Sequence, residues 1–478
     1  MTGNRYAGFD DLDRPSSSCK APPRFRPHGF ALSSRRSFMD RSGGNEASVW
    51  RSGKMHVDQM TVQASREPVA IIVAPPWLRT GTGRVIEAQI EYYRARGFRT
   101  AFVAVANHPL HVKSDPMWRR FREGAEDLAC DVVAIAALRR RPRPRTPLRR
   151  IRQLFCRRTA LDWIIELGTI ANLPVDLVDF AGSDALCVMH VNHVYTMGFA
   201  ERLAKCLSSQ RVPTIVDTHD IQAHIISDNG YENPWTRRQD SQDELLKREV
   251  RWLSRADVLV HISAEDLAFF SARIPWRPHV LAVPPVPGPQ RSISDEAAPP
   301  ADLLFVGTGH IANLKALVWF FEAVWPILAP MGLSLTIVGA VDELMRLQQP
   351  GLFGTYRSHF VGGVRSLNAY YRAARCVIAP MTSGRGISIK TIEAMAFARP
   401  LVATSKAFRG MPLDEIAAAG LLPRDDPSDF AEAVMSSLGA EQEGARNRAI
   451  YEKLFSPAKY FAAMDAANRL ATQRHRHL

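Results

Sequence analysis

The strongest constraint on the fold is an alternation of short apolar runs with amphipathic segments, which occurs twice along the chain. The first example starts with "PVAIIVAPP" at 68–76, an apolar β-rich run. It continues with "GTGRVIEAQIEYYRARG" at 81–97, where the apolar side chains recur at helical spacing and Gly97 ends the pattern. The run "FRTAFVAVA" follows at 98–106. A strand, a helix and a strand at this spacing predict a βαβ unit and therefore a parallel sheet.

The same alternation continues to about residue 283. A segment at 232–256, "ENPWTRRQDSQDELLKREVRWLSRA", has the pattern of one long amphipathic helix. Four further apolar runs predict buried strands: "CDVVAIAAL" at 130–138, "ALCVMHVNH" at 185–193, "PTIVDTHD" at 213–220 and "ADVLVHIS" at 256–263.

A proline-rich segment then divides the chain. The stretch "VPPVPGPQRSISDEAAPP" at 283–300 contains six prolines and no periodicity, which is typical of a linker. A second α/β pattern starts at "ADLLFVGTG" and includes the apolar helix "NLKALVWFFEAVWPILA". We therefore predict a disordered basic tail, two doubly wound α/β domains joined by a linker, and a C-terminal helix that packs back on the first domain. The predicted boundaries are 1–65, 66–283, 284–300, 301–455 and 456–478.

Composition limits the functional classes. Hydrophobic residues make up 46% of the 478 residues, as expected for globular domains with full cores. We expect no apolar run of the ~18 residues that span a bilayer and no secretory signal. The six cysteines are scattered, which indicates a reducing compartment and no zinc site. The net charge of +13 predicts an anionic partner.

The stretch "TSGRGISIKTIEAMAFARP" at 382–400 carries the clearest chemistry. A glycine turn, with Gly384 and Gly386, leads into a helix whose free N–H groups favour a phosphate. Lys390 adds a positive charge there, and Glu393, about one turn further into the helix, has a carboxylate that could accept hydrogen bonds from a ribose diol. The alternative for Glu393 is a glutamate stabilised by the helix dipole alone.

These residues also carry a family resemblance. "SGRGISIKTIEAMAFARPLVATS" is similar to the pattern "GxGIKxKxLEAMAxGxPVVATS" of group-1 (family 4) glycosyltransferases, and "LLFVGTG", "LTIVGAV" and "HFVGGVRSLNAYYRAARCVIAPM" resemble other segments of that family. "PTIVDTHD" and "REVRWLSRADVLVHIS" resemble its N-terminal half. The likeness covers roughly 66–460. It implies a GT-B fold, in which two Rossmann-like domains face a central cleft, and retaining sugar transfer from a nucleotide sugar.

The resemblance also implies roles for individual residues. Glu393 would bind the ribose, and Asn313 and Lys315 would lie near the donor diphosphate, although Lys315 could equally be a solvated helix residue. Arg385 departs from the family pattern, because many members carry a first glutamate at this place. Its guanidinium could bind phosphate, or it could be an exposed turn residue. Gly81 and Gly83 would form a loop facing the cleft; a plain helix N-terminus is the alternative.

The first domain offers candidates of its own. His219 and Asp220 follow a buried strand, so they are expected at its carboxyl end, where ligands bind in such sheets. We assign them as the catalytic candidates, with His193 as a second histidine of the same kind. The alternative is a turn in which Asp217 and Asp220 make local backbone caps.

The stretch "LRRRPRPRTPLRRIRQLFCRR" at 138–158 contains ten arginines and no acidic residue. Helical spacing places apolar residues on one face, which is typical of a helix on an anionic membrane surface. A solvated loop with a packed helix is the alternative, and a nucleic-acid partner is not expected because no stacking aromatics accompany the arginines. The candidate membrane or acceptor residues are Arg149, Arg150, Arg152 and Phe155.

The sequence thus predicts a metal-independent glycosyltransferase without a cofactor, whose donor is a nucleotide sugar and whose acceptor is a glycan, a lipid-linked molecule or a small molecule. Its expected location is cytoplasmic, peripheral to the inner face of the membrane. Two alternatives remain open: another GT-B enzyme, such as a sugar-nucleotide epimerase or a phosphorylase, and a non-catalytic carbohydrate- or nucleic-acid-binding relative.

Overall fold

The structure is a computed structural model. It describes residues 67–78, 81–105, 115–136, 158–166, 177–181, 186–234, 236–286 and 297–476. The predicted tail at 1–65 lies outside these residues, as do most of the arginine-rich stretch and the middle of the proline-rich linker.

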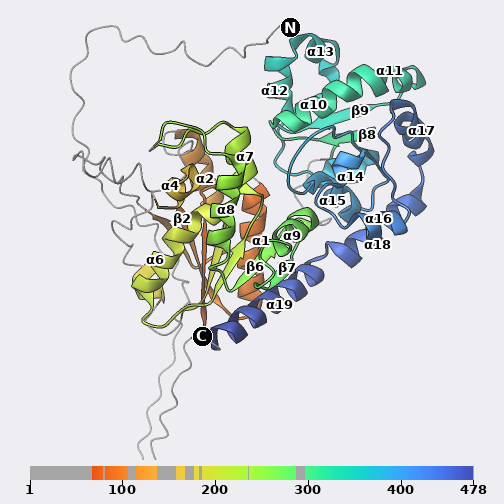
Figure 1. Cartoon of the computed structure of the whole chain (residues 1–478). Helices are drawn as coiled ribbons and strands as arrows, with labels where there is room; N and C mark the ends of the chain where they lie inside the picture. The colour runs from red at the N-terminus through yellow and green to blue at the C-terminus, as the bar shows by residue number, and fades with distance from the viewer. Residues whose placement is uncertain are drawn as a thin grey trace, which may run out of the picture. The chain divides into compact units, whose positions relative to one another are not determined.

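The first domain, the N-terminal lobe, is built on a seven-stranded parallel sheet (Figure 1). The strand order is β3-β2-β1-β4-β5-β6-β7, so the winding reverses between β1 and β4. This confirms the predicted parallel α/β architecture. Only the last strand was not expected from the sequence. The strands are β1 (Val69–Ala74), β2 (Arg99–Val105), β3 (Val132–Ala136), β4 (Leu186–Asn192), β5 (Thr214–Asp217), β6 (Val258–His261) and β7 (His279–Leu281).

The helices of this lobe bury the faces that their sequences predict. In α1, the apolar side chains at helical spacing, from Val85 to Tyr93, are all buried. The described elements are α1 (Gly81–Ala95), α2 (Asp115–Asp127), α4 (Ala160–Glu166), η1 (Val194–Thr196), α6 (Met197–Leu207), α7 (Gln222–Asp228), α8 (Gln242–Leu253) and α9 (Ala264–Ser271).

The prediction of one long helix over 232–256 is wrong in its first half. Helix α8 begins only at Gln242, because Ser241 and Glu244 form a reciprocal capping box that fixes the helix start. Before it, Arg237 has a positive φ of 59°, which no helix residue adopts. The residues before Gln242 show helical spacing in the sequence but do not form a helix.

The second domain, the C-terminal lobe, has a five-stranded parallel sheet ordered β10-β9-β8-β11-β12. Its winding reverses between β8 and β11. The strands are β8 (Ala301–Val306), β9 (Leu335–Val338), β10 (Phe360–Gly362), β11 (Ala374–Ala379) and β12 (Leu401–Ala403). The helical elements are α10 (Ile311–Trp319), η2 (Phe320–Val324), α11 (Trp325–Leu328), η3 (Ala329–Met331), α12 (Val341–Gln348), α13 (Pro350–Thr355), η4 (Arg357–His359), α14 (Asn368–Ala373), α15 (Ile389–Ala396), η5 (Ser405–Phe408), α16 (Leu413–Ala418), α17 (Pro427–Ser437), α18 (Glu441–Leu454) and α19 (Pro457–Arg476).

One helical stretch of the described residues, Ile311–Met331, is long and apolar enough to cross a membrane, contrary to our expectation of no such run. Length and composition alone are weak evidence of a span, and 56% of its apolar window is buried inside the lobe. Leu317, Phe320 and Phe321 belong to the core cluster of the C-terminal lobe. Packing against the sheet therefore accounts for this apolar character.

Helix α19 returns from the C-terminal lobe to the sheet of the N-terminal lobe (Figure 1). It contacts β5, β6 and β7, and its Tyr460 and Met464 are buried in a cluster with side chains of β1 and β2. Outside this core, Arg96, just after α1, forms an ion pair with Asp465, at 2.7 Å. The last helix thereby covers one face of the first sheet.

Candidate functional site

The turn between β11 and α15 is shaped by its glycines. Gly384 and Gly386 have φ values of 133° and 60°, where other residues are strained. A Cβ on Gly384 would lie 2.8 Å from the guanidinium carbon of Arg409, so this position has no room for a side chain. The N-cap residue, Ser388, makes no capping hydrogen bond from its side chain. The first N–H groups of α15 are therefore uncapped by Ser388, as an anion site at a helix N-terminus requires.

Lys390 lies in the first turn of α15 and points toward β8 and α10. Its Nζ donates a hydrogen bond to Asn313 Oδ1, at 2.5 Å, and lies 4.3 Å from the centre of the Phe305 ring. Burial, helped by the positive charge of Arg409, lowers the pKa of Lys390 to about 7. This cation is thus only partly charged at neutral pH without an anion beside it.

The structure brings Asn313 to this group but not Lys315. Asn313 is buried on α10, and its Nδ2 donates to the carbonyl of Thr308, at 2.9 Å. Lys315 lies on the same helix but is exposed, and it makes no ion pair or hydrogen bond in the described part of the chain. The prediction that Lys315 lies near the diphosphate is therefore not supported, and the solvated-residue alternative describes its position.

Glu393 lies about one turn into α15, which starts at Ile389, as the sequence predicts. Its side chain is 8% exposed, and Tyr371 donates its hydroxyl to Oε2 at 2.9 Å. Burial raises the pKa of Glu393, although this hydrogen bond opposes the shift. Its other oxygen, Oε1, has no hydrogen-bond partner among the described residues, so Glu393 retains an acceptor for a ligand.

Arg385 is exposed and forms an ion pair with Asp228, at the end of α7. Neither of the two hypotheses for this arginine included such a partner, which comes from the other lobe. Its carbonyl also accepts a hydrogen bond from Arg409 Nε, at 3.2 Å.

Two basic side chains near the turn, Arg409 and His310, were missed. Arg409 packs on Gly384, and burial lowers its pKa. His310 caps α10 by accepting the N–H of Ala312 at 3.1 Å, and both burial and the charges of Arg409 and Lys390 lower its pKa. The only sequence signal for His310 was its place just after a predicted strand, and Arg409 had no such signal.

In the N-terminal lobe, His219 is held in an unusual conformation after β5. It has a φ of 60°, is 3% exposed, and its Nε2 lies 2.8 Å from Asn192 Oδ1. Because that oxygen can only accept, Nε2 must carry the proton, which leaves Nδ1 as an acceptor. Burial lowers the pKa of His219 to about 4, so the imidazole is neutral at physiological pH.

His219 belongs to a stack of aromatic side chains from the ends of β1, β4 and β5. The rings of His219 and His193 lie 4.0 Å apart, and His193 stacks on Tyr195 at 4.9 Å. Trp77, after β1, meets His193 edge to face. These strands include the reversal of the first sheet, β1 and β4, where ligands of doubly wound folds bind. His193 therefore lies beside His219, as its place in the sequence suggested.

A buried polar network lies beneath this stack and was not predicted. Gln89 of α1 donates to Asn192 Oδ1 at 3.0 Å and to Asp217 Oδ2 at 2.8 Å, and Asn192 donates back to Gln89. Tyr93 and His190 join it through a contact of 3.0 Å. The network fixes Asn192 and, through it, the ring of His219.

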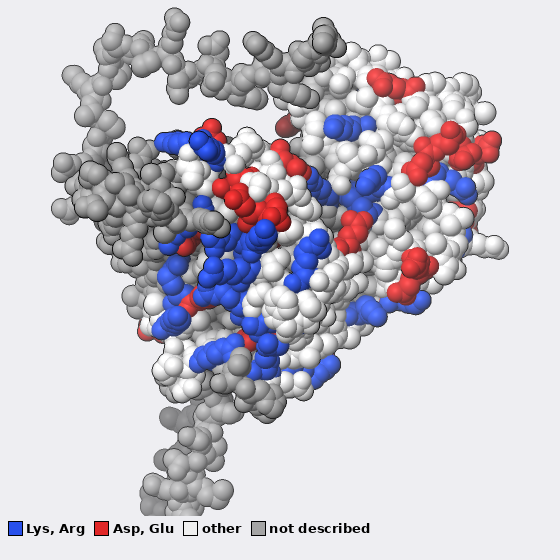
Figure 2. Space-filling view, in the orientation of Figure 1, with Lys and Arg blue, Asp and Glu red and all other residues white. Residues whose placement is uncertain are grey.

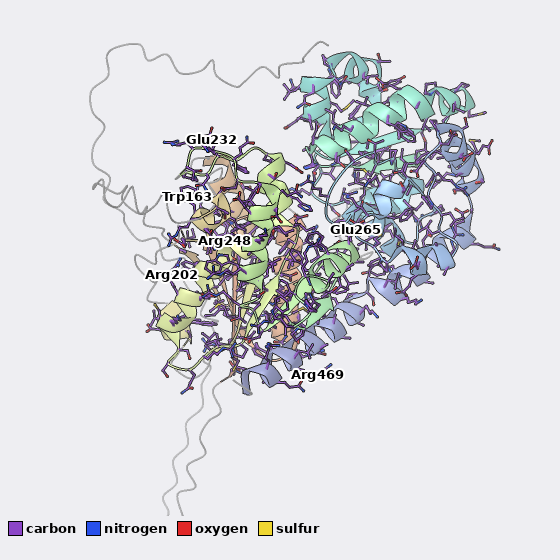
Figure 3. The ribbon with its side chains drawn as sticks, in the orientation of Figure 1. Trp163, Arg202, Glu232, Arg248, Glu265 and Arg469 are labelled. Carbon is purple, nitrogen blue, oxygen red and sulfur yellow. The ribbon has the colours of Figure 1, made fainter. Side chains whose placement is uncertain are left out.

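Asp220 faces the glycine turn of the C-terminal lobe. A Cβ on Gly386 would lie 3.2 Å from Asp220 Oδ1. Burial raises the pKa of Asp220 to about 6, although Arg385 and Arg409 oppose the shift. A second contact joins the lobes nearby, since Ala264 donates its N–H to the carbonyl of Gly410 at 2.9 Å, next to Glu265 on α9 (Figure 3).

The glycines after β1 form the first turn of α1, not a separate loop before it. Gly83 is buried, and a Cβ there would lie 1.9 Å from the carbonyl oxygen of Leu78. Gly81 is exposed, with open space around its Cα. The prediction that Gly83 lies in a loop is therefore wrong. Gly83 is in the first turn of α1, where close packing against Leu78 leaves no room for a side chain, and this matches the alternative of a plain helix N-terminus.

The candidate membrane or acceptor residues cannot be located in the fold. Arg149, Arg150, Arg152 and Phe155 lie outside the described residues. Across the described ranges, no group of three or more His, Cys, Asp or Glu side chains could hold a metal ion.

Comparisons with known proteins agree with this architecture. Three solved structures overlay on 84–85% of the chain and on 98–99% of their own length. They are Anabaena Alr3699/HepE in complex with UDP (11% identity, TM-score 0.51), a glycosyltransferase from Rickettsia africae (10%, 0.51), and the pneumococcal O-GlcNAc transferase GtfA in complex with UDP and GlcNAc (9%, 0.53).

The fold is GT-B. At these identities the likeness establishes the fold alone. Residues 300–439, which include the glycine turn and α15, match the family model for group 1 glycosyl transferases. A search of curated proteins gave no match. The group-1 sequence signal thus lies in the C-terminal lobe of this GT-B chain, as the resemblance of "SGRGISIKTIEAMAFARP" suggested.

Proposed function

We propose that this chain is a retaining glycosyltransferase of family 4, which moves a sugar from a nucleotide sugar to a glycan, lipid-linked or small-molecule acceptor. The observation that carries the proposal is the grouping at the start of α15. An uncapped helix N-terminus, the Lys390 cation and a buried carboxylate with a free oxygen lie within two turns of one helix. A helix N-terminus and a cation suit a diphosphate, and a buried carboxylate oxygen suits a ribose diol.

Different positions along the start of α15 would bind different parts of the donor. The glycine turn and Lys390 would hold the diphosphate, and Glu393 Oε1 would accept a hydrogen bond from the ribose. UDP-sugars are the first donors to test, since the Anabaena and pneumococcal structures contain UDP.

The chemistry would run without a metal or a cofactor. The bond between the anomeric carbon and the phosphate oxygen breaks, and the helix N-terminus with Lys390 stabilises the charge that develops on the departing diphosphate. The acceptor hydroxyl bonds to the anomeric carbon on the same face, and its proton passes to the leaving phosphate oxygen. His219 Nδ1 would accept a hydrogen bond from a hydroxyl of the reacting sugar, and Asp220 would lie close to the turn that binds the phosphates.

Lys390 gives this proposal a pH signature. Its pKa of about 7 rises when a diphosphate binds, so the affinity for UDP should fall above pH 7, by at most about tenfold per pH unit. Calorimetric titrations between about pH 7.5 and 8.5, above the last phosphate pKa of UDP and below the pKa of its uracil ring, measure this directly. Lys390→Arg should bind with little pH dependence, because guanidinium stays charged. A wild-type affinity that is constant over this range contradicts the assigned role of Lys390.

The proposed function includes a location at a membrane surface. A basic, amphipathic sequence at 138–158 would hold the enzyme at the inner face of a membrane during polysaccharide biosynthesis, with the rest of the chain in the cytoplasm.

A panel of nucleotide sugars tests the proposed function. Thermal shifts identify the donor, and release of nucleoside diphosphate is then followed with and without inorganic phosphate. Transfer or donor hydrolysis that needs no phosphate supports a glycosyltransferase. A strict phosphate requirement identifies a phosphorylase instead, and binding without turnover identifies a non-catalytic relative.

A further inference from the structure

A cavity of about 410 Å³ lies between α4 and α8 of the N-terminal lobe. Its volume is within the range of small-molecule sites. None of its lining residues belongs to the candidate donor site. The lining contains four cations, two carboxylates and one aromatic ring: Arg158, Arg248, Arg251, Arg255, Asp162, Glu166 and Trp252.

One carboxylate of the lining already has a structural task. Asp162 Oδ2 accepts the backbone N–H of Thr159 at 2.9 Å and an ion pair from Arg248 at 3.0 Å, while Oδ1 accepts from Trp252 at 3.3 Å. Asp162 therefore caps the start of α4 and fixes the guanidinium of Arg248. Its charge is shared among these donors.

The other pairs also hold arginines in place. Arg158 donates to Glu166 at 2.7 Å across α4. Arg255 forms an ion pair with Glu201 of α6, and its guanidinium lies 4.5 Å from the centre of the Trp252 ring. Such preset guanidinium groups lose little conformational freedom when an anion binds.

Arg251 is the exception. It is exposed beside Arg248 on α8, and in the described part of the chain it makes no hydrogen bond or ion pair. Among the described residues, the lining has two more positive than negative charges. Lys205 and Arg202 of α6 add to this, because both act electrostatically on Glu201.

The excess charge is visible on the surface. Figure 2 shows Lys and Arg side chains gathered over α6 and α8, and Figure 3 labels Arg202 and Arg248 in this region. The helix dipole explains part of the pattern, since cations stabilise a helix C-terminus such as that of α8. It does not explain Arg158, which precedes α4, nor the cavity between the two helices.

We propose that this cavity binds an anionic phosphate group, from a phosphate monoester or a diphosphate. Guanidinium forks match phosphate oxygens in geometry, and two excess positive charges match the charge of a phosphate monoester at pH 7. The phosphate would lie against Arg251 and Arg248, and the exposed part of Trp252 would cover the ligand's adjoining group. The proposal rests on the cavity and not on the donor site.

Calorimetric titration of inorganic diphosphate into the full chain tests this proposal. Arg251→Gln should weaken binding to the cavity about tenfold, the loss expected for one hydrogen bond to a charged group. Arg346→Gln is the matched control, because Arg346 is an exposed arginine on α12 of the C-terminal lobe. It should bind diphosphate like the wild type. Equal affinity of Arg251→Gln and the wild type overturns the proposal, as does an equal loss in the control.

The donor site could also bind diphosphate, so Lys390→Met is titrated beside the others. Binding that depends on Arg251 but not on Lys390 supports the cavity and counts against the proposed donor site. Binding that depends on Lys390 alone supports the donor site and overturns the cavity.

The source of the phosphate is distinguished in a second arm. Phosphatidylcholine vesicles with and without phosphatidic acid are sedimented with the wild type and with Arg251→Gln. Once diphosphate binding is shown to depend on Arg251, Arg251-dependent binding to the phosphatidic acid vesicles as well identifies a lipid headgroup, whereas Arg251-dependent binding of free diphosphate alone identifies a soluble ligand. If neither depends on Arg251, the cavity is not a phosphate site.

Discussion

Replacing Glu393 by alanine is expected to weaken UDP binding by roughly 10- to 100-fold, the range for one or two hydrogen bonds to a charged group. The reason is the free oxygen of this buried carboxylate, which no described residue of the protein uses. Alanine removes the acceptor for the ribose and leaves the glycine turn intact. Calorimetric titration of UDP measures the change directly.

Two variants make this result interpretable. Glu432→Ala removes an exposed carboxylate on α17 and should bind UDP like the wild type. Tyr371→Phe removes only the hydroxyl that donates to Glu393. Comparing it with Glu393→Ala shows how much of the lost affinity comes from this hydrogen bond and how much from the carboxylate itself. Wild-type affinity in Glu393→Ala, with an unchanged melting temperature, would rule out the ribose role.

The second large effect concerns turnover and not binding. His219→Asn should lower the rate of sugar transfer by roughly 10²- to 10³-fold, the range for losing one positioned polar group at a reacting centre. Asparagine tolerates the positive φ of this position better than alanine does, so the fold should persist. The affinity for UDP should stay unchanged, because His219 is assigned to the reacting sugar, which UDP lacks.

The pH dependence offers a second check on His219. Its pKa of about 4 means that the ring stays neutral between pH 6 and 8, so changes of rate in that range cannot arise from its ionisation. A wild-type rate in His219→Asn, or a loss of UDP affinity equal to the loss of rate, would contradict its assignment to the reacting sugar.

The parallel sheets could be predicted because their strands are short apolar runs between helical patterns, as in Val69–Ala74. The glycine turn could also be predicted, since Gly384 and Gly386 adopt a positive φ that other residues avoid. Both are local properties of the sequence. The start of α8 was mistaken because one capping box at Ser241 outweighed a longer run of helical spacing.

The remaining parts of the site depend on contacts between distant segments. Gln89 meets Asp217 across 128 positions, and Arg385 meets Asp228 from the other lobe. Lys315 and Lys390 are equally basic in sequence, and only the packing of α10 and α15 determines which of them contacts Asn313. The role of Arg409 followed only from its position on Gly384.

The central claim is that the start of α15 binds the diphosphate and ribose of a nucleotide sugar. The most direct test is a calorimetric titration of UDP and of the other nucleoside diphosphates into the full-length wild type at pH 7. The account predicts saturable binding, with one molecule per chain at this site, for at least one of them. Absence of binding for every nucleotide and nucleotide sugar, in a protein that melts cooperatively, would contradict it.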